Sequence, residues 1–203
     1  MLLEMVVPAV LQLALFSAIP FFYWLIRHKN RGPFLQWLGL KQAAFPNKKK
    51  AVIFSCLAFL ILISSGLLLV SALDNQETMA NAKFASMGVS GLGLILIYAI
   101  VQTGLSEELL FRGFLLKRLS GRWGFGIGNT IQALLFGLLH GVVLFNTIPV
   151  ILVIAIIAFS ATAGGIMGYI NDKLGNGSIL PSWFIHSLMN ISSSLVVAFN
   201  VFG

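Results

Sequence analysis

Three charged side chains, Glu107, Glu108 and Arg112, lie inside the stretch Ser106–Lys117, which is otherwise apolar between its two polar ends. The chain has only six acidic residues, so this stretch holds a third of them. A charged group at the centre of a membrane helix costs at least about 2.5–3.5 kcal/mol on insertion scales, so such groups usually have partners and a function. On a helix, Glu108 and Arg112 are four residues apart and can form an ion pair, which leaves Glu107 as the free carboxylate.

Two histidines and an asparagine in later apolar segments are the candidate partners of Glu107. A hairpin is expected around residues 120–124. Glu107 lies before this hairpin and His140 after it, at nearly the same number of residues from the turn. Two antiparallel helices therefore bring both side chains to a similar depth. His186 and Asn190 are four residues apart, so they project from one face of the last helix. We expect all four side chains to converge in the cytoplasmic half of the membrane.

These residue types are suited to the hydrolysis of a peptide bond by direct attack of water. A carboxylate beside a histidine can act as a general base, and a second histidine with an asparagine can donate hydrogen bonds to an oxyanion. The chain has no Gly-x-Ser-x-Gly elbow, and its single cysteine, Cys56, lies in an apolar run, so nucleophilic catalysis is disfavoured.

A metal is the open alternative for the same site. The chain has no His-Glu-x-x-His motif, and its sequence requires no cofactor. Glu107, His140 and His186 could still complete a three-ligand zinc site. The residue types alone do not choose between a metal-bound water and a glutamate-held one. We favour the latter, because Asn190 is a poor zinc ligand and a good oxyanion donor.

The composition indicates an integral membrane protein. The chain has 203 residues, of which 58% are hydrophobic and 9% charged, whereas soluble domains carry about 25% charged residues. Its apolar runs are long, which predicts α-helices rather than the short alternating strands of a barrel. The net charge of +7 does not indicate a nucleic-acid partner, because the basic residues flank apolar runs. There they act as topology signals and contact lipid headgroups.

An all-α polytopic membrane protein with about six transmembrane helices is therefore expected. The predicted crossings are residues 2–26, 51–73, 88–119, 125–144, 148–170 and 179–201. Residues 27–50 form a loop with seven lysines and arginines and no acid, so the positive-inside rule predicts a cytoplasmic loop and places both termini outside. Residues 1–89 then form two leading helices, and residues 90–203 form the catalytic helical core.

Three finer structural expectations follow from the same pattern. A helix over 88–119 would be about 48 Å long, so its end should project beyond the hydrocarbon core of about 30 Å. Gly164 and Gly168 are four residues apart and should let two helices pack closely. Asn171–Ser178 should be a short polar cytoplasmic loop.

The spacing of the candidate residues resembles the motifs of a known family. Glu107-Glu108-x-x-x-Arg112, Phe136-x-x-x-His140 and His186-x-x-x-Asn190 are similar to the three motifs of the CPBP intramembrane proteases. These are CAAX-processing and bacteriocin-processing enzymes, also called the Abi family and often labelled metalloproteases. The resemblance covers about residues 90–200, in the family's order.

The resemblance implies a role for each motif residue in an intramembrane endopeptidase. Glu107 and His140 would activate water. His186 and Asn190 would form the oxyanion hole. Glu108 and Arg112 would support the site, and Phe136 would pack beside His140.

We therefore expect an endopeptidase of the bacterial plasma membrane that contacts membrane lipids and cleaves peptides or lipidated proteins. Its role would be peptide or bacteriocin processing, or self-immunity. One alternative is a non-enzymatic immunity protein that binds a bacteriocin or its receptor, and its protection would survive loss of Glu107. Another is a small transporter with a glutamate–histidine proton relay, which predicts pH-dependent flux without peptide hydrolysis.

Overall fold

The computed structural model describes residues 2–72 and 79–201, and all regular structure within them is helical. The expected all-α polytopic fold is confirmed. Six of the described α-helices lie outside the long central segment: α1 (Leu2–Arg27), α2 (Phe34–Leu38), α3 (Lys48–Ser71), α7 (Phe125–Leu144), α8 (Val150–Tyr169) and α9 (Leu180–Ala198). The central segment is one helix over Gly88–Trp123, which contains α4 (Leu92–Leu96), α5 (Ser106–Glu108) and α6 (Lys117–Trp123).

The Gly88–Trp123 helix is the longest element and carries the acidic pair. Its 36 residues include the whole of the predicted crossing 88–119 and extend it to Trp123. Two stretches of it, Ile97–Leu105 and Leu109–Leu116, have the wide π-helical turn, and α5 is the short α-helical link between them. π turns are rare and are frequent at functional sites. Glu107 and Glu108 thus lie where the helical winding changes twice within a few residues.

Five helices are long and apolar enough to cross a membrane in the part of the chain that the structure describes. They are Leu2–Arg27, Lys48–Ser71, Gly88–Trp123, Phe125–Leu144 and Val150–Leu174. The predicted sixth crossing coincides with α9, which has 19 residues but is not among the five. Serines, His186 and Asn190 lower the hydropathy of α9. The sixth crossing and the orientation of the termini stay predictions.

A tight hairpin joins α6 to α7 and sets the relative depth of the site residues. Gly124 is the only residue between the two helices, and its φ of +82° is one that a glycine adopts without strain. One turn later, a Cβ on Gly128 would lie 2.5 Å from the backbone nitrogen of Ser120. Glycine at both positions therefore lets α7 return directly along the end of the long helix.

Close packing of α7 on α8 fixes the part of the bundle beside the site. A Cβ on Gly137 would lie 2.5 Å from the carbonyl oxygen of Ile157, and one on Gly164 would lie 3.3 Å from Cα of Ala133. At Gly168 a Cβ would overlap the side chain of Asn129. The expected close approach at Gly164 and Gly168 is confirmed.

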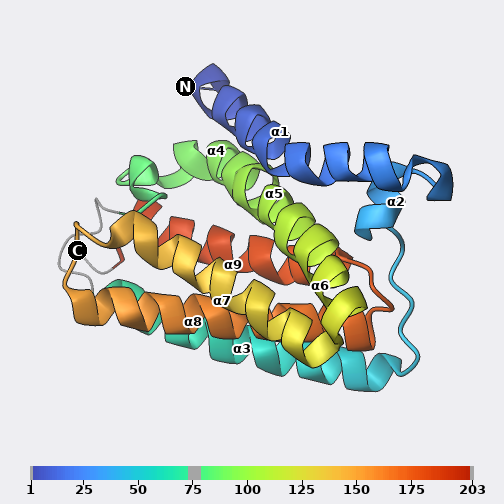
Figure 1. The fold of residues 1–203 in the computed structure, drawn as a ribbon. Coiled ribbons are helices and arrows are strands. Elements are labelled where there is room, and N and C mark those ends of the chain that lie inside the picture. The colour runs from blue at the N-terminus through green and yellow to red at the C-terminus, as the bar shows by residue number, and fades with distance from the viewer. Residues whose placement is uncertain (1, 73–78, 202–203) are drawn as a thin grey trace.

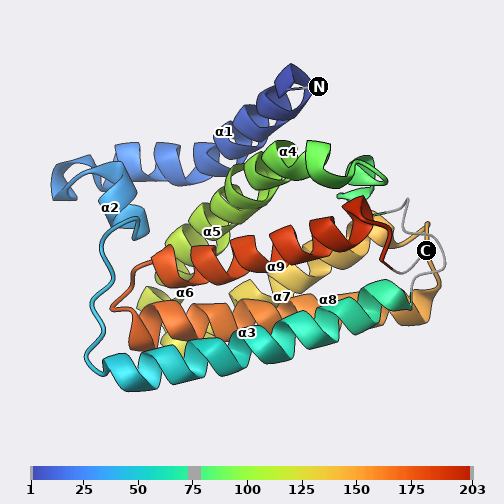
Figure 2. The ribbon, with the colours of Figure 1, turned by 180° about the vertical axis from the view of Figure 1, so that it is seen from behind.

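The long helix packs on α7, and α1 lies on the long helix away from the α7–α8 pair (Figures 1 and 2). The long helix lies between α1 and α9, and α3 packs on α8 and α9 at the opposite side of the bundle. The basic region 27–50 contains α2, whose Leu38 is fully buried; a Cβ on Gly113 would lie 2.8 Å from its carbonyl oxygen. This region is therefore docked on the long helix.

The expected polar loop at Asn171–Ser178 is wrong in its first half. The helix of α8 continues as a π-helical turn over Ile170–Leu174, and Asn171 is 2% exposed. Its side chain has polar partners inside the bundle, described below, which a residue in a solvated loop would not need.

Candidate functional site

Glu108 is the centre of a buried polar network. Its Oε1 lies 3.0 Å from Nη1 of Arg112, the partner expected from the spacing of four residues. The same oxygen lies 3.0 Å from Nδ1 of His186, and Oε2 accepts a hydrogen bond from the hydroxyl of Ser182. Both carboxylate oxygens therefore have partners, two of which come from α9.

Arg112 is fully enclosed and has one further neighbour that suits a guanidinium. Its Cζ lies 4.2 Å from the centre of the Phe136 ring, a cation–π contact. Its nitrogens form no well-aligned hydrogen bond with the described residues, so its contact with Glu108 is an ion pair. The charge is thus compensated by one carboxylate and one aromatic face, which holds α7 against the long helix.

Glu107 faces both histidines of the predicted site. Its Oε2 lies 4.0 Å from Nε2 of His140 on α7 and 3.7 Å from Nε2 of His186 on α9. This oxygen is buried and has no hydrogen-bond partner among the described residues. Three helices therefore bring one acidic oxygen and two imidazole nitrogens together.

The hydrogen bonds of the two rings assign their tautomers. Nδ1 of His140 lies 2.8 Å from the carbonyl oxygen of Phe136, so Nδ1 carries the proton and Nε2 has the lone pair. By the same reasoning, Nδ1 of a neutral His186 donates to Glu108 and leaves its Nε2 lone pair toward Glu107. Three acceptor atoms then face one another with no donor between them. Such an arrangement takes up a proton, a water molecule or a cation.

Asn190 lies one turn beyond His186 and has a different neighbour. Its Nδ2 donates a hydrogen bond of 2.7 Å to Oγ1 of Thr103 on the long helix. The structure therefore brings Glu107, His140 and His186 into one cluster and places Asn190 at its edge, oriented by a residue outside the predicted set.

Phe136 packs among the rings of the site, as its position one turn before His140 predicts. Its ring centre lies 4.5 Å from that of His140, 5.0 Å from that of Phe111 and 5.9 Å from that of His186. Together with its carbonyl contact to His140, this makes Phe136 the apolar support of both imidazoles.

Sequence reasoning missed Ser182 and Asn171. Ser182 precedes His186 by four residues, so it projects from the same face of α9 as His186 and Asn190. Following this face one turn toward the start of the helix would have found Ser182. Asn171 accepts a hydrogen bond of 3.2 Å from the backbone N–H of Ser182 and donates one to its hydroxyl. No local signal marks Asn171, because its role depends on the unexpected extension of α8.

The three metal candidates fit zinc in donor type, and Oε2 of Glu107 lies within 4.0 Å of both imidazole nitrogens. Two imidazole Nε2 atoms with fixed Nδ1–H groups and one carboxylate are a common zinc ligand set. Among the described residues, however, no group of three or more His, Cys, Asp or Glu side chains is arranged to hold a metal ion.

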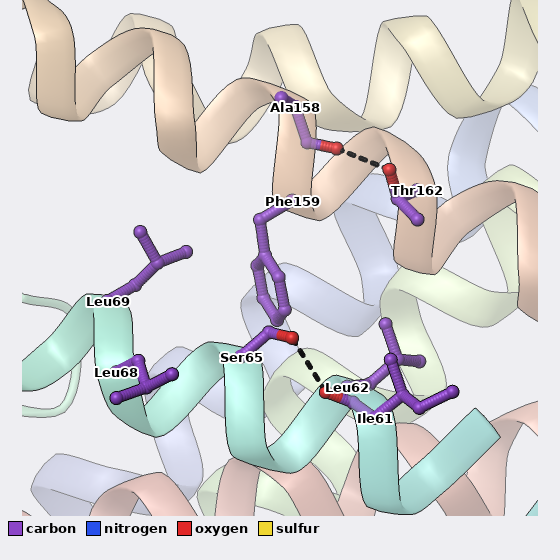
Figure 3. A pocket seen from close by; sticks show the side chains of 8 residues that line it. All are labelled: Ile61, Leu62, Ser65, Leu68, Leu69, Ala158, Phe159 and Thr162. Carbon is purple, nitrogen blue, oxygen red and sulfur yellow. Dashed lines mark hydrogen bonds between the residues drawn. The ribbon is translucent and has the colours of Figure 1, made fainter. Parts of the chain in front are cut away.

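A separate cavity of about 480 Å³ lies between α3 and α8 (Figure 3). Its lining is apolar except for Ser65 and Thr162, whose hydroxyls donate to carbonyl oxygens of their own helices, Ile61 and Ala158. It contains no titratable side chain, so it carries none of the chemistry of the site.

Comparison with known proteins gives one match. A family model described as type II CAAX prenyl endopeptidase Rce1-like matches residues 89–192. The matched stretch contains every candidate residue from Glu107 to Asn190. No curated protein and no solved structure matches the chain.

Proposed function

Because this match covers just over half of the 203 residues, the chain belongs to the Rce1-like type II CAAX prenyl endopeptidase family, and we propose that it hydrolyses peptide bonds with water activated by Glu107 and His140. Membership of the family and the apolar helices make it an intramembrane endopeptidase in general terms.

The proposal rests on a cluster of three acceptor atoms, one buried carboxylate oxygen and two imidazole nitrogens. Oε2 of Glu107 has Nε2 of His140 and of His186 within 4.0 Å and no donor of its own. A water molecule held by Glu107 and His140 would lose a proton to Glu107 while its oxygen attacks the scissile carbonyl. The same proton then passes to the leaving amine, which completes the hydrolysis.

Two groups on α9 are suited to stabilise the oxyanion. Glu108 holds Nδ1–H of His186, and a carboxylate at this position stabilises positive charge on the ring. A proton that the three acceptor atoms take up would convert Nε2 of His186 into a donor, and Asn190 has a second amide N–H beyond the one that Thr103 accepts. In this mechanism Arg112 and Ser182 neutralise and orient Glu108.

The test is hydrolysis of a peptide with a farnesylated cysteine followed by three residues, by purified protein in detergent. Glu107→Gln, which keeps the size of the side chain, and His140→Ala should each lower kcat by about 10²–10⁴-fold. The control is Asp172→Asn, which removes an acid whose partner is the exposed Lys173 and should leave kcat unchanged. Wild-type turnover by the Glu107 variant would refute the mechanism.

The proposed substrates are membrane-associated peptides or lipidated proteins of the bacterial plasma membrane, with peptide or bacteriocin processing or self-immunity as the role. The resemblance of the three motifs to the CPBP proteases, which include bacteriocin-processing enzymes, supports this role. Comparing membrane peptides between cells with wild-type protein and cells with Glu107→Gln would reveal the substrates. A non-enzymatic immunity protein would protect cells equally well in both forms, and that outcome would overturn a proteolytic role in immunity.

A further inference from the structure

We infer that Thr103 is a positioning residue that fixes the amide of Asn190 for the oxyanion; this rests on the role proposed for Asn190. The contact is short, with 2.7 Å between Nδ2 of Asn190 and Oγ1 of Thr103. Thr103 lies outside the three sequence motifs, four residues before Glu107. It therefore joins the helix of the catalytic carboxylate to the helix of the oxyanion donor.

The direction of the hydrogen bond is settled by the other contact of Thr103. Its hydroxyl donates to the carbonyl oxygen of Tyr98, five residues earlier, at 3.1 Å. The only proton of the hydroxyl is then used, so Oγ1 can only accept from Asn190. This requires the NH₂ group of Asn190, rather than its carbonyl oxygen, to face Thr103. The amide is thereby fixed in one of its two flipped orientations.

The π-helical winding sets which backbone carbonyl the Thr103 hydroxyl reaches. Thr103 lies in the stretch Ile97–Leu105, where a hydroxyl reaches the carbonyl five residues back instead of the usual four. The next residue, Gly104, faces α9 so closely that a Cβ would lie 2.9 Å from the hydroxyl oxygen of Ser187. The absence of a side chain at Gly104 thus brings α9 within reach of Thr103.

A second contact holds the same two segments together on the other side of His186. Nε1–H of Trp183 donates to the carbonyl oxygen of Ile100 at 2.8 Å. Trp183 is three residues before His186, and Asn190 is four residues after it. The register of α9 on the π-helical stretch is therefore held by Trp183, while the Thr103 hydroxyl is left to orient the Asn190 amide.

The experiment compares Thr103→Val, which has the same shape without the hydroxyl, with Thr103→Ser, which keeps the hydroxyl. On the farnesylated peptide, Thr103→Val should lower kcat about tenfold with little change in KM, less than the 10²–10³-fold cost of losing an oxyanion donor outright. Thr103→Ser should retain wild-type kcat. The matched control, Thr162→Val, removes a hydroxyl that bonds only within its own helix and should change neither constant.

A double-mutant cycle separates positioning from general packing. If Thr103 acts through Asn190, then Thr103→Val should cause no further loss of kcat in the Asn190→Ala background. Wild-type kcat in Thr103→Val, or the same tenfold loss in both backgrounds, would overturn the inference. If Thr103→Val does not fold, Thr103→Ala carries the same test. Wild-type kcat in Asn190→Ala would instead refute the proposed role of Asn190 itself.

Discussion

Gly137 offers a sharp test of how closely the reaction depends on the packing of α7. This glycine lies between Phe136 and His140 and faces α8. A Cβ there would lie 2.5 Å from the carbonyl oxygen of Ile157 and 2.9 Å from Cβ of Ala161. Backbone atoms cannot rotate away as the end of a side chain can, so Gly137→Ala must move one helix relative to the other.

The size of the movement follows from these distances. Ordinary contact begins near 3.4 Å, so the two helices must separate by about 0.9 Å at this point. Overpacking costs about 1–3 kcal/mol, and the helix propensity of alanine over glycine returns about 1 kcal/mol of it. The net loss of stability is then only about 0–2 kcal/mol. A misplacement of about 1 Å at a reacting group can lower the rate about 10²-fold. Gly137→Ala should therefore lower kcat strongly while the protein stays folded.

The assay is kcat on the farnesylated peptide together with the thermal midpoint of the protein in detergent. The matched control is Gly165→Ala on α8, where a Cβ would meet its nearest atoms at 3.8 and 3.9 Å. Gly165→Ala should keep wild-type kcat and gain up to about 1 kcal/mol of stability. Gly137→Ala with wild-type kcat, or an equal loss of kcat in the control, would refute the dependence of the site on α7 packing.

Three further outcomes are expected. Ser182→Ala should lower the thermal midpoint, because a hydrogen bond to a charged group is worth about 1.5–3 kcal/mol and Glu108 loses one, and it should lower kcat as well. Gln12→Leu should weaken the docking of α1 by about 0.6–2 kcal/mol, because it removes the amide contact with Gln102. Leu11→Ala, on the exposed face of α1, should not weaken it. The rate of limited proteolysis after α1 at increasing detergent concentration measures the difference. Incubation with a zinc chelator should leave peptide hydrolysis unchanged if Glu107 holds the water, and a loss that added zinc restores would show that a metal is required.

The parts of the site that could be predicted are those that regular helix geometry determines. The ion pair of Glu108 with Arg112 follows from a spacing of four residues, and it is present at 3.0 Å. The matched depth of Glu107 and His140 follows from counting residues on either side of one hairpin, and their side chains lie 4.0 Å apart. The second prediction succeeded because the two helices are joined by a single residue, so little freedom is left in their register.

The parts that could not be predicted depend on departures from regular helices or on distant partners. The π-helical turns have no pattern that distinguishes them from an α-helix, and without them the contact of Thr103 with Asn190 is not expected. The burial of Asn171 depends on the extra turn of α8. The docking of α1 through Gln12 depends on tertiary packing, because a single amide in an apolar helix does not identify its partner.

The contrast between the two carboxylates is the strongest argument for the assignment of roles. A carboxylate buried in a membrane bundle is costly unless it is paired, so an acid that existed only for stability would have a partner at each oxygen. Glu108 meets this condition, because both of its oxygens have partners. Oε2 of Glu107 does not, since no described residue donates to it, although two imidazoles lie within 4.0 Å. This contrast supports the proposal that Glu108 is the structural acid and that Glu107, which still lacks a donor, holds the attacking water.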